Sequence, residues 1–344
     1  MNKLPKFTSL LFGAFLAGSV WFVPLFTQLV SAQIDGKKSP SKSKPAAKSA
    51  EKPGDESSKK GAAGDTEAKR LLAKARERLS GYRSIKADLV EKIVLEGRSY
   101  DASGTYLQGS RRRLKLEFTV RIGNFKGSML EVCDGEILWN QYTIFKKPAK
   151  PGGEPQKSVT LTRRDVRQIL DAARRTRQDP KNLLAVELGL GGLPALLASI
   201  DDAMTFDQVR VMKLKGKSLT VLEGGWNVAM LQTLGAAPKE DGADPPKLPP
   251  HVPDRVRLYF ENLGEDNLFP RRIQYLKKHS KGDGYRAMLT LDFNNVRVNE
   301  PVNEALFDFV PPDGDGVNQE DITNLYLERL RAAPPAAQPP LRKQ

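Results

Sequence analysis

Alternation of apolar and polar residues with a period of two is the feature that most constrains this chain. In the stretch RRRLKLEFTV, Leu114, Leu116 and Phe118 fall on one side of an extended segment, and Lys115 and Glu117 fall on the other. A segment of this kind buries only one face, so it needs neighbouring strands beside it and a cover for that face. The chain is therefore expected to build a sheet with one apolar side.

The same alternation recurs along the chain. Segments with this period lie at 89–95, 104–108, 129–133, 137–142, 204–216, 218–226, 255–262, 271–278 and 286–298. Asp134-Gly135 between two of them is a hairpin signal, and the DASG stretch at 101–104 is typical of a turn. Sheets this long curl, and helices can cover the concave face. The pattern favours the α+β class, mainly β, with an antiparallel sheet around a helical insert.

Helical patterns occur before the strands and between them. The opening segment begins at Thr66, a fair N-cap, and Gly81 fits its C-terminal end. Its apolar stripe consists of Leu71, Leu72, Ala75 and Leu79. Residues 163–177 predict one further helix, and residues 179–200 predict two short helices with a break at 189–194.

The amino terminus has the pattern of an export signal. Residues 1–32 combine Lys3 and Lys6 with an apolar run and small residues before Gln33, which predicts a signal peptide. An uncleaved anchor is the alternative, because apolar residues continue beyond Pro24. Cys133 is the only cysteine, so no intramolecular disulfide can form. We expect a periplasmic or cell-envelope protein that stays tethered to the membrane if the signal is not cleaved.

The rest of the chain divides by composition. Residues 33–65 are rich in Lys, Ser, Pro and Ala and carry no aromatic side chain, which predicts a disordered linker. Residues 66–317 are expected to form one folded domain. Residues 318–344 are expected to form a helical turn followed by a disordered tail.

Charge and reactive side chains exclude several functions. The net charge of +14 would suit nucleic acid or anionic lipid, but no recognition motif accompanies it, so no nucleic-acid partner is expected. His251 and His279 lie in loop-like settings, and Cys133 is expected to be a buried inert thiol. The DGDGVNQED stretch is no calcium loop, because Val317 stands at a ligand position. We expect no catalysis, no cofactor and no metal site.

Several motifs in order carry a resemblance to a known family. ARERLSGYRSIKADLVEKIV, GTYL followed by RRRLKLEF, CDGEILWNQY, FPRRIQY and FDFVPPDG resemble successive segments of the periplasmic lipoprotein-carrier family, the LolA-like group. The resemblance implies an unclosed, strongly curved antiparallel β-barrel with a helical lid, whose last strand would be ALFDFVPP at 305–312. It also implies an apolar cavity for lipid or lipoprotein acyl chains.

The chain departs from the family in three respects. Lys115 occupies the position that matches a family arginine, and a lysine does not form the bidentate contact on which a lid lock of that kind is built. The middle insert with GLGGLPALLASI is longer than a simple carrier needs, and a long linker precedes the domain.

The resulting hypothesis is an exported, non-catalytic protein that holds acyl chains, for transport or sorting across the envelope. The residues expected to line its cavity are Leu114, Leu116, Phe118, Leu130, Val132, Trp139, Leu258, Phe260, Leu289, Leu291 and Phe293. The alternative is an envelope sensor or scaffold that uses the same fold to bind a membrane or envelope protein partner.

Overall fold

The computed structural model divides the chain into two compact units. It describes residues 56–60, 62–95, 98–122, 125–146, 156–175, 190–214, 216–236, 248–250, 252–262, 268–279, 284–314 and 316–332. The first unit contains the chain up to Ala75 together with Ala203–Thr290, and the second contains Arg76–Asp202 together with the chain from Leu291 onward. The sequence predicted one domain over residues 66–317, whereas the contacts within the chain group into two.

Strands make up most of the described residues, as the alternating pattern predicted. They are β1 Glu56–Lys60, β2 Ile85–Leu95, β3 Arg98–Gln108, β4 Leu114–Ile122, β5 Phe125–Cys133, β6 Ile137–Lys146, β7 Gln156–Asp165, β8 Met204–Leu214, β9 Lys217–Trp226, β10 Arg255–Asn262, β11 Leu268–Lys278, β12 Tyr285–Val298 and β13 Val317–Asp321. The α+β, mainly β class is thereby confirmed.

Helices connect and cover these strands. They are α3 Ala62–Gly81, α4 Val166–Arg175, α6 Gly192–Ala203, α7 Val228–Thr233, the short 3-10 helix η1 Glu304–Phe307 and α8 Thr323–Ala332. None of these described helices is both long and apolar enough to cross a membrane.

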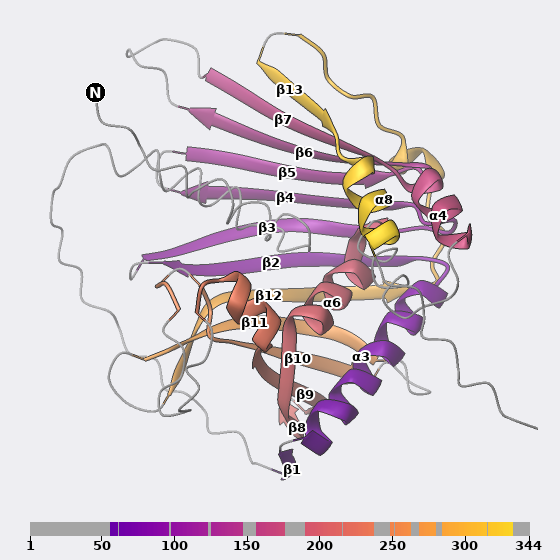
Figure 1. Ribbon diagram of the computed structural model, residues 1–344. Helices are drawn as coiled ribbons and strands as arrows, with labels where there is room; N and C mark the ends of the chain where they lie inside the picture. Colours follow the sequence, from indigo (N-terminus) through magenta and orange to yellow (C-terminus); the bar gives the residue numbers. More distant parts are fainter. Residues whose placement is uncertain are drawn as a thin grey trace, which may run out of the picture. The chain divides into compact units, whose positions relative to one another are not determined.

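The second unit is built on a linear antiparallel sheet with one parallel pair at its edge (Figure 1). Its strand order is β12-β2-β3-β4-β5-β6-β7-β13. Each neighbouring pair from β2 to β7 is antiparallel, and β13 runs parallel to β7. The predicted hairpin at Asp134-Gly135 is confirmed, because the Asp134 carboxylate accepts the backbone N–H groups of Glu136 and Ile137.

Strand β3 is longer than the sequence predicted. The DASG stretch at 101–104 was interpreted as a turn, but it lies inside the strand. Gly104 sits opposite Phe118, and a Cβ atom built there would lie 1.8 Å from the carbonyl oxygen of Glu117. The glycine is therefore needed for the close approach of β4, not for a turn.

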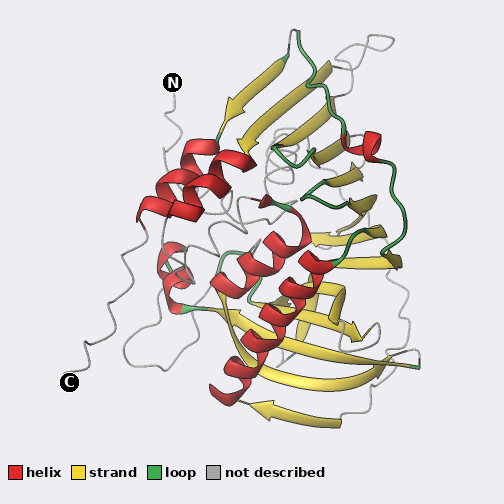
Figure 2. Ribbon diagram, turned by 90° about the vertical axis from the view of Figure 1, so that its right-hand side faces the viewer, coloured by secondary structure: helices red, strands yellow, loops and turns green. Residues whose placement is uncertain are grey.

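The predicted closing strand at 305–312 is wrong. Residues 304–307 form η1, and the chain then runs without a strand to β13. Figure 2 shows this segment on one side of the strands and the helices of the same unit on the other. Phe307 is only 1 % exposed and lies against Gly109, whereas Phe309 is half-buried and stacks on Trp139 with ring centroids 5.9 Å apart. Two prolines after Phe309 favour such a strand-free path.

The first unit has its own sheet, in the order β1-β8-β9-β10-β11-β12. Val256, Leu258 and Phe260 of β10 lie on one side of it and are buried. Charged residues lie on the other side, where the buried Glu223 carboxylate pairs with Arg255 at 3.1 Å and Arg257 at 2.6 Å. One face of this sheet is thus apolar, and the other combines these ion pairs with a small buried cluster of Met212, Leu219, Val221 and Tyr259.

Two helix boundaries differ from those that the sequence predicted. Helix α3 begins at Ala62 rather than Thr66, and β1 lies within the predicted linker. Asp65 accepts the backbone N–H of Phe206 at 2.9 Å, which anchors the early part of α3 in the first unit. The helix expected from residue 163 begins at Val166, because residues 163–165 complete β7.

The ends of the chain lie outside the described residues. These are the predicted signal peptide at 1–32, the first part of the linker to residue 55 and the tail from residue 333. The helical turn expected after residue 318 is confirmed by α8.

Phe307 and Phe309 should contribute unequally to stability. We expect Phe307→Ala to lower the free energy of unfolding by about 3–5 kcal/mol, because it empties a fully buried site. Phe309→Ala should cost roughly 1–2 kcal/mol, since the ring is only partly buried. Urea denaturation measures both. Val310→Ala is the matched control, because this side chain is 88 % exposed. Equal losses at positions 307 and 309 would contradict the packing described.

Candidate functional site

The candidate site is one face of the sheet of the second unit, here called the helix-covered face. Strand register defines it, because residues directly opposite one another on antiparallel strands point to the same side. Leu116 lies opposite Tyr106 on β3 and Glu131 on β5. The described side chains of this face on β2 to β6 are those of Ile85, Ala87, Leu89, Glu91, Ile93, Arg98, Tyr100, Ala102, Tyr106, Gln108, Leu114, Leu116, Phe118, Val120, Met129, Glu131, Cys133, Leu138, Asn140, Tyr142 and Ile144.

Helices cover one end of this face. Val166 of α4 packs with Leu114, Cys133 and Leu138. A second cluster joins α4, α6 and α8 to one another through Ile169, Ala198, Tyr326, Leu327 and Leu330. Figure 1 shows α4 and α8 side by side near the ends of β6 and β7. The helices thus bury apolar strand residues that an open sheet would leave in water.

A buried ionic network lies beneath these helices. The side chains of Glu131 on β5 and Arg164 on β7 are each 7 % exposed, and their charged groups approach to 3.6 Å. Asn140 on β6 lies between them. With its amide oriented so that Nδ2 faces the carboxylate, it donates to Glu131 at 2.7 Å and accepts from Arg164 at 2.7 Å. Burial raises the pKa of Glu131, while Arg164 acts in the opposite direction.

The network also holds helices. The Glu131 carboxylate accepts the backbone N–H of Gly192, the first residue of α6, at 3.0 Å. The next N–H, from Leu193, donates to the hydroxyl of Tyr106 at 3.3 Å. Arg164 donates to the hydroxyl of Tyr326 on α8 at 3.1 Å. The start of α6 and the middle of α8 are therefore joined to the sheet by a few directional polar contacts.

Glycine is required where α6 begins. Gly191 and Gly192 have φ angles of 72° and 74°, in the left-handed region. A Cβ atom at Gly191 would lie 2.9 Å from the Glu131 carboxylate and from the Leu138 side chain. The predicted break at 189–194 therefore marks the point where the backbone meets the buried carboxylate.

Glu91 of β2 is a second buried carboxylate on this face. It is 3 % exposed, and its Oε2 atom has no hydrogen-bond partner. Burial raises its pKa from 4.5 to about 8. The alternation in IKADLVEKIVL already placed Glu91 between Leu89 and Ile93, so the sequence carried the signal for this group.

The structure separates the predicted cavity residues. Leu114, Leu116 and Phe118 lie on the helix-covered face and are buried. Leu291 and Phe293 are buried in the same unit. Leu258, Phe260 and Leu289 belong to the first unit, where Leu258 and Phe260 share the apolar side of β10 and Leu289 is half-buried.

Leu130, Val132 and Trp139 lie on the opposite face of the sheet. Leu130 is directly opposite Glu117, and Val132 is opposite both Lys115 and Trp139. The expectation that they share a face with Leu116 is wrong, because alternation within each strand does not determine which side of β5 matches which side of β4. Alternation within a single strand could not have revealed this difference.

The cysteine and the described histidine lie where the sequence predicted, one buried and the other exposed. Cys133 is buried, and burial raises the pKa of its thiol to about 12. His279 is exposed, and His251 lies outside the described residues. Lys115 pairs with Glu117 at 2.9 Å on the side away from the helices. Among the described residues, no three metal-ligating side chains are grouped to hold an ion.

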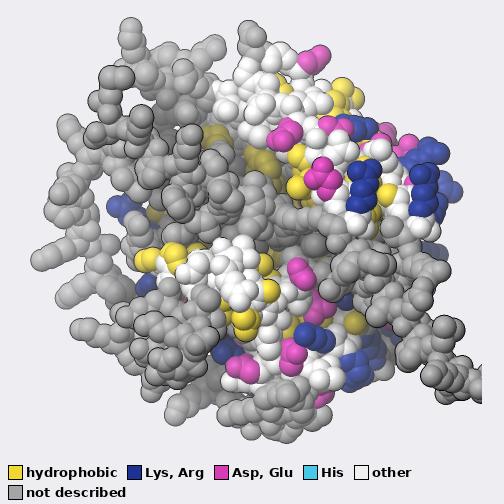
Figure 3. Space-filling model, in the orientation of Figure 1, with side chains coloured by type: hydrophobic (Ala, Val, Ile, Leu, Met, Phe, Trp, Pro, Cys, Tyr) yellow, Lys and Arg dark blue, Asp and Glu magenta, His cyan; other side chains and the backbone are white. Residues whose placement is uncertain are grey.

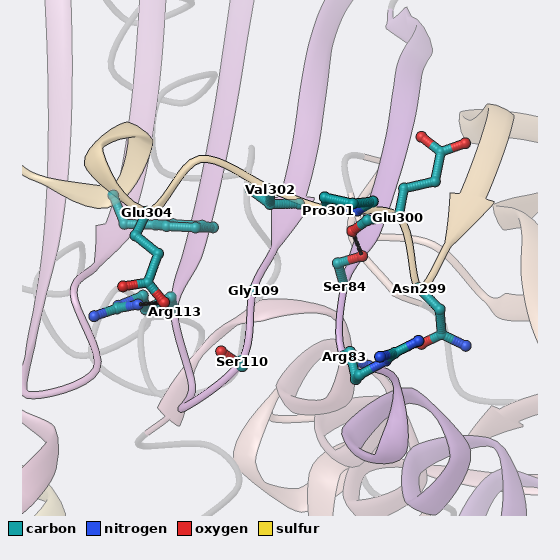
Figure 4. A pocket seen from close by; sticks show the side chains of 11 residues that line it. Arg83, Ser84, Gly109, Ser110, Arg113, Asn299, Glu300, Pro301, Val302 and Glu304 are labelled. Atoms are coloured by element: carbon teal, nitrogen blue, oxygen red, sulfur yellow. Dashed lines mark hydrogen bonds and ion pairs between the residues drawn. The ribbon is translucent and has the colours of Figure 1, made fainter.

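A separate pocket of about 390 Å³ lies beside the β3–β4 turn of the second unit (Figure 4). Arg113 in its wall pairs with Glu304 at 2.5 Å, and the Ser84 hydroxyl donates to the carbonyl oxygen of Glu300 at 2.5 Å. The backbone N–H of Arg83 donates to the side chain of Asn299. These contacts join the segment after β12 to the strands, so we interpret the pocket as part of that packing.

The outer surface of α4 and α8 carries charges of both signs. Figure 3 shows Lys and Arg side chains beside Asp and Glu over these helices. Arg167 on α4 lies 3.7 Å from Glu136, and Arg174 lies 3.2 Å from Asp171. Two of the arginines of α4 are therefore paired with nearby carboxylates.

Comparison with known proteins finds likeness only among solved structures. No family model and no curated protein matches the chain. LprF from Mycobacterium bovis is 13 % identical, with 71 % of this chain and 97 % of that chain covered and a TM-score of 0.30. The lipoprotein LppX from Mycobacterium tuberculosis is 11 % identical (70 % and 98 %, TM-score 0.28). A LolA superfamily protein from Nitrosomonas europaea is 10 % identical (70 % and 97 %, TM-score 0.24). The LolA superfamily, which the sequence resembles, is thus among the structures this chain is similar to.

Removing Arg164 should destabilise the protein strongly. Arg164→Ala leaves the buried Glu131 carboxylate without its charge partner, and the expected cost is about 3–5 kcal/mol of unfolding free energy. Arg167→Ala is the matched control, because its ion pair is exposed and should contribute roughly 0–1 kcal/mol. A double-mutant cycle of Arg164→Ala with Glu131→Gln, followed by urea denaturation, measures the coupling. A coupling energy near that of the exposed pair would contradict the buried network.

Glu91 should make stability fall as pH rises. Its pKa of about 8 in the folded protein exceeds the ordinary value of 4.5, so the folded state binds more protons between these values. Unfolding free energy should therefore decrease across this window, by at most about 5 kcal/mol, and level off above it. Glu91→Gln should lose this slope, and the control Glu117→Gln should keep it. The measurement is urea denaturation over this pH range, and an unchanged slope in Glu91→Gln would refute the assignment.

Proposed function

We propose that the chain is an exported, non-catalytic binding protein that holds the acyl chains of a lipid or lipoprotein against its apolar sheet faces. The observation that carries this proposal is the cover of the helix-covered face. Short helices lie over continuous apolar rows, and a few polar contacts to Glu131, Tyr106 and Arg164 hold them there. Such a cover can separate from the sheet as a unit more readily than a second sheet could.

Uptake would replace helix–sheet contacts by acyl–sheet contacts. Leu114, Leu116 and Phe118 are buried before any ligand arrives, so the helices must move for an acyl chain to reach them. Each buried methylene contributes about 0.8 kcal/mol, so a long chain can offset the loss of helix contacts and of the polar contacts. The polar contacts would then define one closed position to which the helices return after release.

Export and envelope location support the same function. The basic and apolar pattern of residues 1–32 is typical of a signal peptide, and a protein that carries lipids across the cell envelope needs such a signal to leave the cytoplasm. The predicted linker at 33–65 would give the folded units reach from a membrane if the signal remains as an anchor.

A second function is favoured by how completely the apolar faces are filled. Leu116 and Leu258 have no exposed surface, and Phe118 and Phe260 have almost none. If these residues form a permanent core, the chain acts instead as an envelope sensor or scaffold that binds a protein partner.

A charge at Leu116 should separate the two functions. Leu116→Glu places a carboxylate where acyl chains would lie, at a large desolvation cost unless water enters. If the helices open, this variant should fold and lose uptake of a fluorescent acyl probe, whereas Thr119→Glu, on the opposite face of the same strand, should keep it.

Two outcomes would count against the acyl-binding proposal. One is unchanged probe uptake by a folded Leu116→Glu protein. The other is a Leu116→Glu protein that fails to fold in a circular dichroism melt while native mass spectrometry of the purified wild-type chain finds no bound lipid. This second result would favour the protein-binding function.

A further inference from the structure

Glu91 is the one carboxylate of the helix-covered face that the ionic network does not use. It lies on β2 between Leu89 and Ile93, and it is directly opposite Ala102 on β3. The same cross-strand row continues with Val120 on β4 and Gly127 on β5. The carboxylate is thus set in a row of apolar residues across the sheet.

No cation lies directly opposite Glu91 on β3 or further along its row on β4 and β5. Among the described residues of β2 to β5, the one Lys or Arg on the helix-covered face is Arg98, which is exposed and lies opposite Leu95, four residues along β2 from Glu91. The adjacent Lys92 points to the other face, where it lies opposite Asp101. The other ionisable groups of this face on these strands are Tyr100, Tyr106, Glu131 and Cys133, and none of them is a cation.

An unpartnered buried carboxyl group needs a physical explanation. Its Oε2 atom has no hydrogen-bond partner although the side chain is 3 % exposed. Leaving a buried polar group unpaired is costly, and a leucine at this position would fill the same row without that cost. Unpaired polar groups of this kind occur where a ligand supplies the missing partner. Because no cation of this face lies close enough to influence Glu91, that partner must bring its own donor.

We propose that Glu91 binds the polar end of the long-chain ligand held on this face, and that this end carries an N–H or O–H donor, as an amine or a hydroxyl does. The inference rests on the proposed acyl-binding function and adds the chemistry by which the ligand is chosen. Apolar strand residues contact the chain of any ligand alike, whereas Glu91 selects ligands that can donate a hydrogen bond.

The protonation of Glu91 makes the two kinds of donor distinguishable. Burial raises its pKa to about 8, so the free carboxyl group is mostly protonated at neutral pH. A hydroxyl group can donate to this neutral carboxyl group and accept from it, with no change in protonation. An ammonium group favours the carboxylate, so Glu91 gives up its proton to solvent as the ion pair forms. Amine binding should therefore release close to one proton, and alcohol binding none.

The test uses titration calorimetry of the full chain with three matched probes: n-decylamine, n-decanol and decyltrimethylammonium, a cation without an N–H donor. The variants are Glu91→Gln, which keeps a donor and an acceptor, and Glu91→Leu, which keeps neither. Glu117→Gln, on the opposite face of β4, is the control. Circular dichroism establishes that each variant folds.

The expected result is a loss of affinity confined to probes with a donor. Decylamine should bind about tenfold or more weakly to both Glu91 variants, and decanol should lose affinity only in Glu91→Leu. Decyltrimethylammonium should bind all variants alike. Calorimetry in two buffers of different ionisation enthalpy should detect proton release for decylamine with wild type and not with Glu91→Gln.

Two results would overturn the inference. Only the second of them would also overturn the proposed acyl-binding function. If decylamine and decanol bind both Glu91 variants as tightly as wild type, Glu91 does not bind the polar end of the ligand. The acyl-binding function is not contradicted by this result. If no probe binds wild type or the Glu117→Gln control, the acyl-binding function itself fails, and the inference fails with it.

Discussion

The carboxylate of Glu131 is the contact on which the arrangement of the second unit depends. It receives the first backbone N–H of α6, it pairs with Arg164, and Arg164 in turn holds Tyr326 of α8. A buried charge tolerates only geometries that satisfy it, so this network positions the helices more narrowly than apolar contacts could. The apolar clusters of α4, α6 and α8 supply most of the burial, and the carboxylate specifies where that burial occurs.

Two carboxylates on one face therefore have opposite roles. Glu131 is surrounded by donors from β6, β7 and α6, and it serves the closed structure. Glu91 has small apolar neighbours and an oxygen atom without a partner, so it destabilises the structure without ligand wherever it is ionised. A residue that lowers stability can be retained by natural selection because of its function rather than its contribution to folding.

The strands and most of the site were predictable from local patterns. Alternation located β8 to β12 within a few residues and placed Glu91 on the same side of β2 as Leu89 and Ile93. The glycines before α6 were recognised as a break in a helical stretch. The closing strand failed because Phe307 and Phe309 show the spacing of a strand. Phe307 instead packs at the β3–β4 turn and Phe309 packs on Trp139, on the face away from the helices.

The sequence by itself determined which residues share a side within each strand, since backbone geometry makes that period unavoidable. Only the tertiary structure decided which side of one strand meets which side of the next, because a shift of register by one residue exchanges the faces without altering the pattern. That is why Leu130, Val132 and Trp139 lie opposite to Leu116. The pairing of Glu131 with Arg164 could not be predicted from the sequence either. The two residues lie on strands separated by β6, and their attraction is strong only because the helices bury them.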